Sequence, residues 1–135
     1  MLHQIKVRMQ LDLFRYFGKI RNMKINAVQA FRALAHETRL AVFRILLKKG
    51  HEGMPAGQIA MRLDVPTSTL STHLSLLEQT GLLYSRREKQ RILYAVNLDS
   101  VQSLLRFLIE DCCAGKPEMC GYELKSHKNA ASNAK

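Results

Sequence analysis

The sequence predicts a mainly helical fold with one small β-hairpin, and three observations support this prediction. Apolar residues recur at helical spacing between residues 27 and 80. Two short strand-like runs follow, at 82–86 and 91–96, with polar residues between them. A last apolar helical stripe begins near residue 99. The length of 135 residues suggests one domain.

Two helices are expected first. The short apolar segment 27–35 forms one of them. Thr38 begins the second, which has Lys48 and Lys49 in its last turn and stops at Gly50, as expected of a helix end. The core stripe of this second helix contains Leu40, Phe43, Leu46 and Leu47.

A helix-turn-helix follows. Pro55 suits the first turn of a third helix, which carries Ile59 and Leu63. Residues 64–66 make a tight connection to a fourth helix, at 67–80, which Gly81 ends. Thr67 or Ser68 is expected to cap this fourth helix, and its apolar face consists of Leu70, Leu74 and Leu77.

The strands 82–86 and 91–96, with a polar tip at 87–90, complete a recognisable order. The last three of these four helices, followed by a strand, a turn and a strand, make up the winged helix-turn-helix plan. Asp99 or Ser100 then begins a long last helix, which ends at Gly115 and Pro117. Its stripe contains Val101, Leu104, Leu105 and Leu108.

The formal net charge of +10 points to a polyanionic partner, either nucleic acid or a membrane surface. Residues 1–22 form a basic amphipathic extension. We weigh three interpretations of it: an arm touching DNA or membrane, a packing helix, or a segment outside a natural product that begins at Met23.

The winged domain is expected over 23–121, and 122–135 is expected to be a polar disordered tail. No long apolar run indicates a membrane-spanning helix or a signal peptide.

The helix at 67–80 is the candidate DNA-reading element, because its second face carries short polar side chains that fit a major groove. The alternative is a plain solvated surface, but such a surface more often uses Glu and Lys. No acidic residue occurs from Val65 to Leu77. The predicted contact residues are Ser68, Thr69, Ser71, Thr72 and His73, the last as a donor to a phosphate or a base.

The hairpin adds a second candidate contact, since a wing places cations against the DNA backbone or the minor groove. The alternative is a hairpin charged only for solubility. Its candidate contact residues are Arg86, Arg87, Lys89 and Arg91, opposed by Glu88 alone.

Three cysteines near the end of the last helix form the sharpest chemical feature: Cys112, Cys113 and Cys120. Free clustered thiols suit a reducing cytoplasm, and three sulfurs without a nearby histidine suit As(III) or Sb(III). Zinc prefers four ligands, so a zinc site would need Asp111 or water as well. Redox sensing through Cys113 and Cys120, or inert cysteines acting as small hydrophobes, are the alternatives.

Taken together, the segments FRALAHETRL at 31–40, PTSTLSTHL at 66–74 and LEQTGLL at 77–83 resemble the ArsR/SmtB family of metal-responsive repressors. The resemblance implies a homodimer, with its seam at helices 27–35 and 101–113, that binds double-stranded operator DNA and releases it on binding an inducer. CCAGKPEMC at 112–120 is similar to the C-terminal segment of arsenite-responsive members. Better-known members carry a Cys-x-Cys pair where Pro55 and Gly57 stand here.

Enzyme functions find no support in the sequence. It has no Gly-rich phosphate loop and no Cys-x5-Arg loop, and His36 is best explained as a helix cap or a buried hydrogen-bond partner. The expected function is that of a cytoplasmic repressor of arsenic-resistance genes, induced by As(III) or Sb(III) without an organic cofactor. The alternative is a repressor controlled by thiol oxidation on the same scaffold.

Overall fold

The computed structural model describes residues 25–121, apart from the side chains of Cys112, Pro117 and Cys120. The chain divides into two compact units, one reaching to Leu104 and the other starting at Leu105. The predictions for residues 1–22 and for the tail at 122–135 lie outside the described residues.

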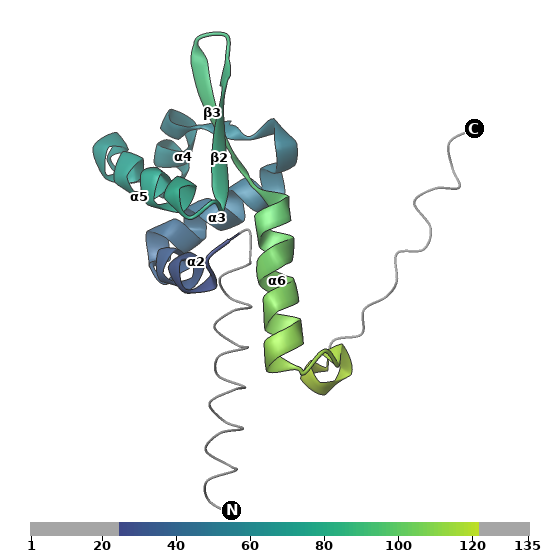
Figure 1. Cartoon of the computed structure of the whole chain (residues 1–135). Coiled ribbons are helices and arrows are strands. Elements are labelled where there is room, and N and C mark those ends of the chain that lie inside the picture. Colours follow the sequence, from purple (N-terminus) through teal and green to yellow (C-terminus); the bar gives the residue numbers. More distant parts are fainter. Residues whose placement is uncertain (1–24, 122–135) are drawn as a thin grey trace, which may run out of the picture. The chain divides into compact units, whose positions relative to one another are not determined.

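The first unit confirms the predicted fold class: a mainly helical winged helix-turn-helix with an antiparallel hairpin. Figure 1 shows the hairpin reaching beyond the helices that precede it. In chain order the elements are α2 (Ala27–Leu34), α3 (Glu37–Lys49), the 3-10 turn η1 (Gly50–Glu52), β1 (Met54–Pro55), α4 (Ala56–Leu63), α5 (Thr67–Gln79), β2 (Leu83–Glu88), β3 (Arg91–Val96) and the start of α6 (Leu98–Cys112).

The short strand β1 is an element that the sequence did not reveal. It pairs antiparallel with β3, so the sheet has the order β1-β3-β2. Pro55 was expected inside the first turn of a helix, but it belongs to β1 and is the N-cap of α4. Gly53 makes this arrangement possible: its φ of 67° and ψ of −171° lie in a region that is essentially restricted to glycine.

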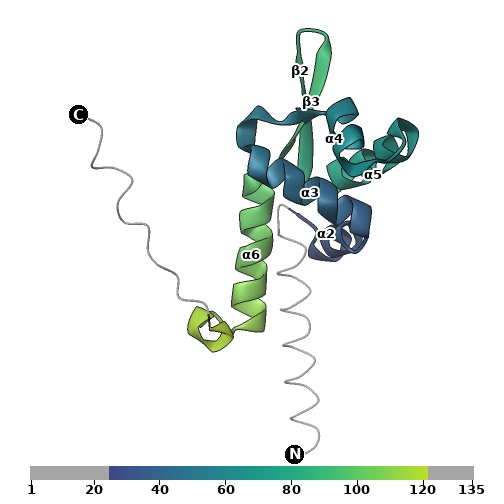
Figure 2. The same cartoon turned by 180° about the vertical axis from the view of Figure 1, so that it is seen from behind.

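The core of the first unit lies where α3, α4 and α5 pack together beside the sheet (Figure 2). The predicted apolar face of α5 is fully buried there, and so are Leu82 and Leu83 where the chain enters β2. This packing fixes the orientation of α5, because any rotation would expose leucine side chains to water. The largest side chains of this core are Leu46, Met54, Ile59, Leu70, Leu74, Leu77, Leu82 and Leu83.

The second unit contains the end of α6 and the 3-10 turn η2 (Pro117–Cys120). Ala114 (φ 49°) and Gly115 (φ 72°) both have positive φ values, and α6 ends at Cys112, shortly before the predicted stop at Gly115. The amides of Cys113 and Gly115 both bond to the carbonyl of Ile109. Among residues 25–121, no helix combines the length and apolar character that a membrane crossing requires.

Candidate nucleic-acid interface

The N-terminal end of α5 has no side-chain cap and no acidic side chain in its first turn. Pro66 occupies the N-cap position, and its side chain makes no capping bond, so the expectation that Thr67 or Ser68 caps the helix is wrong. The first turn also contains no acidic residue. The first amides of a helix lack intrahelical partners and carry the positive end of its dipole. This end therefore attracts an anion such as a DNA phosphate.

The outer face of α5 lies opposite its buried leucines. Ser68, Thr69, Ser71 and Thr72 are all exposed, whereas Leu70 is fully buried. Thr72 donates a hydrogen bond to the Ser68 carbonyl, so its hydroxyl lies close to the helix backbone. Short hydroxyl side chains allow close approach to a groove. Contact of these four residues with DNA stays a prediction, and their exposure is what such contact requires.

His73 differs from the other predicted contact residues because it is only partly exposed. Its ring lies 4.6 Å from the ring of His36, between centroids, and its Nδ1 lies 3.4 Å from a terminal nitrogen of Arg39. A guanidinium only donates, so Nδ1 of His73 accepts and Nε2 carries the proton. Donation to DNA, which stays a prediction, would therefore come from Nε2.

Arg39 connects the end of α2 with His73 on α5. Its Nε donates to the carbonyl of Ala33 and one terminal nitrogen donates to that of Arg32, so it caps the carbonyl end of α2. His36 is the N-cap of α3, where its Nδ1 accepts from the amide of Thr38, which confirms its predicted capping role. The cluster thus ties α2 and α3 to α5 through His73.

Acidification is expected to destabilise the fold through His73. Burial first, and then the neighbouring His36 and Arg39, lower the pKa of His73 below its ordinary value of 6.5. The unfolded chain therefore binds more protons than the folded chain, so the free energy of unfolding falls as pH drops through about 6.5. Urea unfolding at pH 7.5 and pH 5.5 should show this loss, and His73→Gln should reduce it.

The control for this prediction is His51→Gln. His51 is exposed on η1, and its side chain makes none of these contacts. If His51→Gln reduced the loss at pH 5.5 as much as His73→Gln does, burial of His73 would not be its cause.

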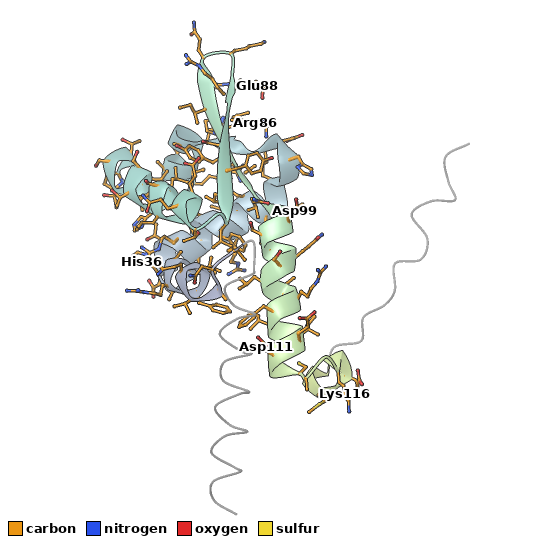
Figure 3. All side chains as sticks on the ribbon, in the orientation of Figure 1. His36, Arg86, Glu88, Asp99, Asp111 and Lys116 are labelled. Atoms are coloured by element: carbon orange, nitrogen blue, oxygen red, sulfur yellow. The ribbon has the colours of Figure 1, made fainter. Side chains whose placement is uncertain are left out.

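The four predicted cations of the wing have two different environments. Arg87, Lys89 and Arg91 are exposed, and Lys89 adopts a φ of 56° at the hairpin tip. Arg86, which is labelled on the hairpin in Figure 3, is instead partly buried, and its guanidinium donates to the carbonyls of His51 and Glu52. It also lies 3.8 Å from the Glu88 carboxylate. Arg86 therefore holds η1 against the wing, a role that its charge alone did not indicate.

A second contact joins the wing to the helix. The hydroxyl of Ser85 on β2 donates to the Glu78 carboxylate on α5 at 2.6 Å. This contact ties β2 to α5, whereas the Arg86 bonds tie β2 to η1. The hydroxyl face of α5 and the strand that leads to the exposed wing cations are thus directly bonded to each other.

The cysteine cluster lies in the second unit. Cys113 is 3% exposed and takes part in a disulfide. The side chains of Cys112 and Cys120 lie outside what the structure describes, so the predicted three-sulfur site stays a prediction. Among the residues that are described, no group of three or more His, Cys, Asp or Glu side chains could hold a metal ion.

Comparison with known proteins agrees with the helix-turn-helix. A family model described as a helix-turn-helix domain matches residues 34–86. The transcriptional activator HlyU of Vibrio cholerae serotype O1 is 32% identical over 82 residues, which are 61% of this chain and 73% of HlyU. The regulator YgaV of Escherichia coli K12 is 30% identical over 64% of this chain and 86% of its own length.

Two further comparisons concern a repressor and a solved structure. The arsenical resistance operon repressor of Escherichia coli K12 is 26% identical over 106 residues, 65% of this chain and 89% of the repressor. The solved ArsR-like transcriptional regulator from Rhodococcus sp. RHA1 has a TM-score of 0.59 at 24% identity, and the match covers 70% of this chain and 87% of that one. This structural likeness shows a common fold.

Proposed function

Because the chain belongs to the ArsR family of winged helix-turn-helix transcriptional regulators, we propose that it is an operator-binding repressor controlled by chemistry at its cysteine cluster. It is a DNA-binding regulator rather than an enzyme. The observation that carries the DNA-binding part is the exposed, acid-free hydroxyl face of α5 above an uncapped helix end.

The protein acts as a homodimer in this proposal. Exposed apolar side chains on α2, among them Val28 and Phe31, and Leu105 on α6 lie on the two helices predicted to form the seam. Burying such residues in a twofold interface removes apolar surface from water. Two copies of α5 would then enter successive major grooves about 34–36 Å apart.

Trivalent arsenic, or antimony, is the proposed inducer. The donor set carries this part: three thiols within nine residues, without a histidine among them, suit a soft pyramidal centre. The likeness to the arsenical resistance operon repressor supports the same choice. Cys112, Cys113 and Cys120 would hold the As(III): each As–S bond would replace one As–O bond of As(OH)3, and each thiol proton would leave with that hydroxide as water. A coupling of about 1–3 kcal/mol between the two sites would lower operator affinity roughly 5- to 150-fold.

Arsenite titration of the protein–DNA complex tests this proposal. The full chain first selects its operator from a random duplex library, and release is then followed by fluorescence anisotropy under a phosphine reductant. Wild-type protein should release DNA with As(III), whereas a variant with Cys112, Cys113 and Cys120 replaced by serine should bind equally well and not respond. Met119→Ser, which removes a sulfur but no thiol from the same segment, should respond like wild type. An arsenite response in the triple variant would refute the site.

Thiol oxidation is the second candidate, and the disulfide on Cys113 favours it. Peroxide would oxidise two thiols to one disulfide, with two water molecules as the other product. If Cys113 and Cys120 form that pair, Cys112→Ser should lose the arsenite response and keep the peroxide response. Loss of both responses in Cys112→Ser would contradict this redox pairing.

A further inference from the structure

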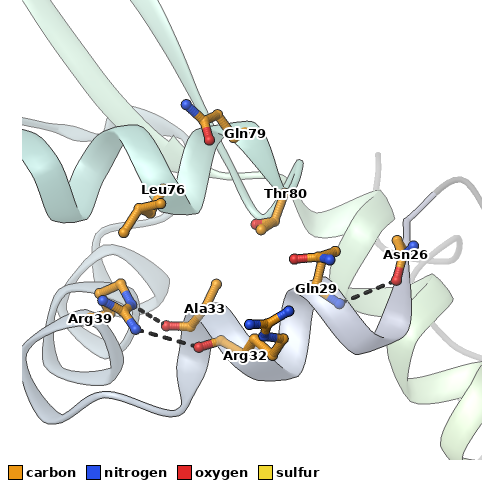
Figure 4. A pocket seen from close by; sticks show the side chains of 8 residues that line it. All are labelled: Asn26, Gln29, Arg32, Ala33, Arg39, Leu76, Gln79 and Thr80. Carbon is orange, nitrogen blue, oxygen red and sulfur yellow. Dashed lines mark hydrogen bonds between the residues drawn. The ribbon is translucent and has the colours of Figure 1, made fainter.

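A pocket of about 600 Å³ lies between α2 and the C-terminal half of α5, within the first unit. Figure 4 shows side chains of α5 on one side of it and those of α2 on the other. Two arginines line it, Arg32 and Arg39, and no acidic residue does. Its other polar lining includes the carboxamides of Asn26, Gln29 and Gln79. The pocket therefore combines positive charge with several hydrogen-bond donors.

Most of these donors are available to a ligand. Asn26 uses its Oδ1 to accept from the Gln29 amide, which leaves its Nδ2 to donate. Arg39 has five N–H groups, of which three have protein partners: the carbonyls of Ala33 and Arg32, and His73. The ion pairs among the described residues 25–121 join Lys49 to Glu52 and Arg86 to Glu88, so none of them involves Arg32. The chemistry that these groups match is an oxyanion with several acceptor atoms.

The position of the pocket indicates which oxyanion reaches it. Gln79 follows Thr72 by seven residues, which is two helical turns, so both lie on one stripe of α5 about 10.5 Å apart along the axis. The pocket thus opens beside the far end of the hydroxyl face. A duplex whose major groove receives the first turns of α5 would carry one of its strands across this end.

We propose that this pocket binds a phosphate group, supplied by the DNA backbone beside the groove that α5 reads. Arg32 is its main charged ligand, with Gln29 and Gln79 as neutral donors, while Arg39 stays committed to the α2 carbonyls. This contact does not depend on base sequence. It fixes the position of α5 along the major groove. This inference rests on DNA binding by α5 and not on the identity of the inducer.

The salt dependence of DNA binding tests the proposal. Neutralising one phosphate contributes about 0.9 to the slope of log Kobs against log salt concentration. Arg32→Gln should therefore make the slope less negative by about 0.9 per occupied pocket and weaken operator and non-operator duplexes by the same factor, roughly tenfold. Arg44→Gln is the matched control: it removes an exposed arginine from α3 that does not line the pocket.

A second experiment distinguishes a DNA phosphate from a free anion as the occupant of the pocket. Inorganic phosphate is titrated into DNA-free protein while the Arg32 Nε–H and the Gln29 and Gln79 side-chain amides are followed by NMR. A changed slope in Arg32→Gln identifies the DNA backbone as the source. An unchanged slope with saturable phosphate shifts that Arg32→Gln abolishes identifies a free anion instead, and the site stands. An unchanged slope without saturable shifts overturns the proposal, and wild-type DNA binding measured alongside shows whether the proposed function itself holds.

Discussion

Replacing Gly53 by alanine is expected to lower the free energy of unfolding by about 3 kcal/mol or more. Gly53 is buried, and its backbone has a φ of 67° and a ψ of −171°, where an L side chain is strongly disfavoured. A Cβ built there would lie 2.7 Å from the carbonyl oxygen of Tyr94, which is backbone of β3 and cannot rotate away. Either β1 leaves the sheet or residue 53 changes conformation, and both disrupt the base of the wing.

Gly57→Ala is the matched control for this prediction. Gly57 lies within α4, and a Cβ added there meets nothing within 4 Å. Alanine restricts the unfolded chain and favours helix, so this variant should be more stable by about 0.5–1 kcal/mol. Urea unfolding of both variants, followed by circular dichroism, checks the pair. Equal stability of Gly53→Ala and wild type would show that β1 does not need this backbone conformation.

Ser68→Glu is expected to raise the free energy of unfolding and to lower operator affinity. Ser68 is exposed in the first turn of α5, which has neither an acidic residue nor a side-chain cap. A carboxylate there complements the helix dipole and should raise the free energy of unfolding by about 0.3–1 kcal/mol. The same carboxylate would face DNA phosphates, and like charges across an interface cost several kcal/mol. Operator affinity should therefore fall by roughly 100-fold or more.

Gln102→Glu makes the same change of charge at an exposed position on α6 and serves as the control. It should reduce operator affinity far less than Ser68→Glu. Anisotropy titrations at fixed salt, with thermal unfolding alongside, measure both quantities. Unchanged affinity in Ser68→Glu would mean that the N-terminal end of α5 does not meet DNA.

The elements whose signals are local were predictable from the sequence. α5 and β3 lie within one residue of their expected bounds. Pro66 and Gly81 mark the ends of α5, and the polar tip marks the turn between the strands, so each boundary is encoded by residues next to it in the sequence. The two-residue strand β1 was missed, since its only evidence is pairing with β3, about forty residues further along the chain. Long-range pairing of so short a segment leaves no periodicity to detect.

The candidate nucleic-acid interface also contains features that the sequence predicts and features that it does not. The exposed hydroxyls of α5 follow from helical spacing, and so could the partial burial of His73, which stands three residues after Leu70 and four before Leu77. The role of Arg86 could not be inferred in this way. Its charge indicates that it prefers a negative partner but not that the carbonyls of η1 would lie beside it. A partner that is backbone has no sequence signature.

The Arg86 and Ser85 bonds at the base of the wing also have a consequence for association kinetics. They hold β2 against η1 and α5 before any duplex is present, so binding has less conformational entropy to remove at Ser85 and Arg86. Association is then limited by electrostatic steering and by the orientation of the encounter rather than by a folding step. Its rate should depend steeply on ionic strength and only weakly on the flexibility of the wing.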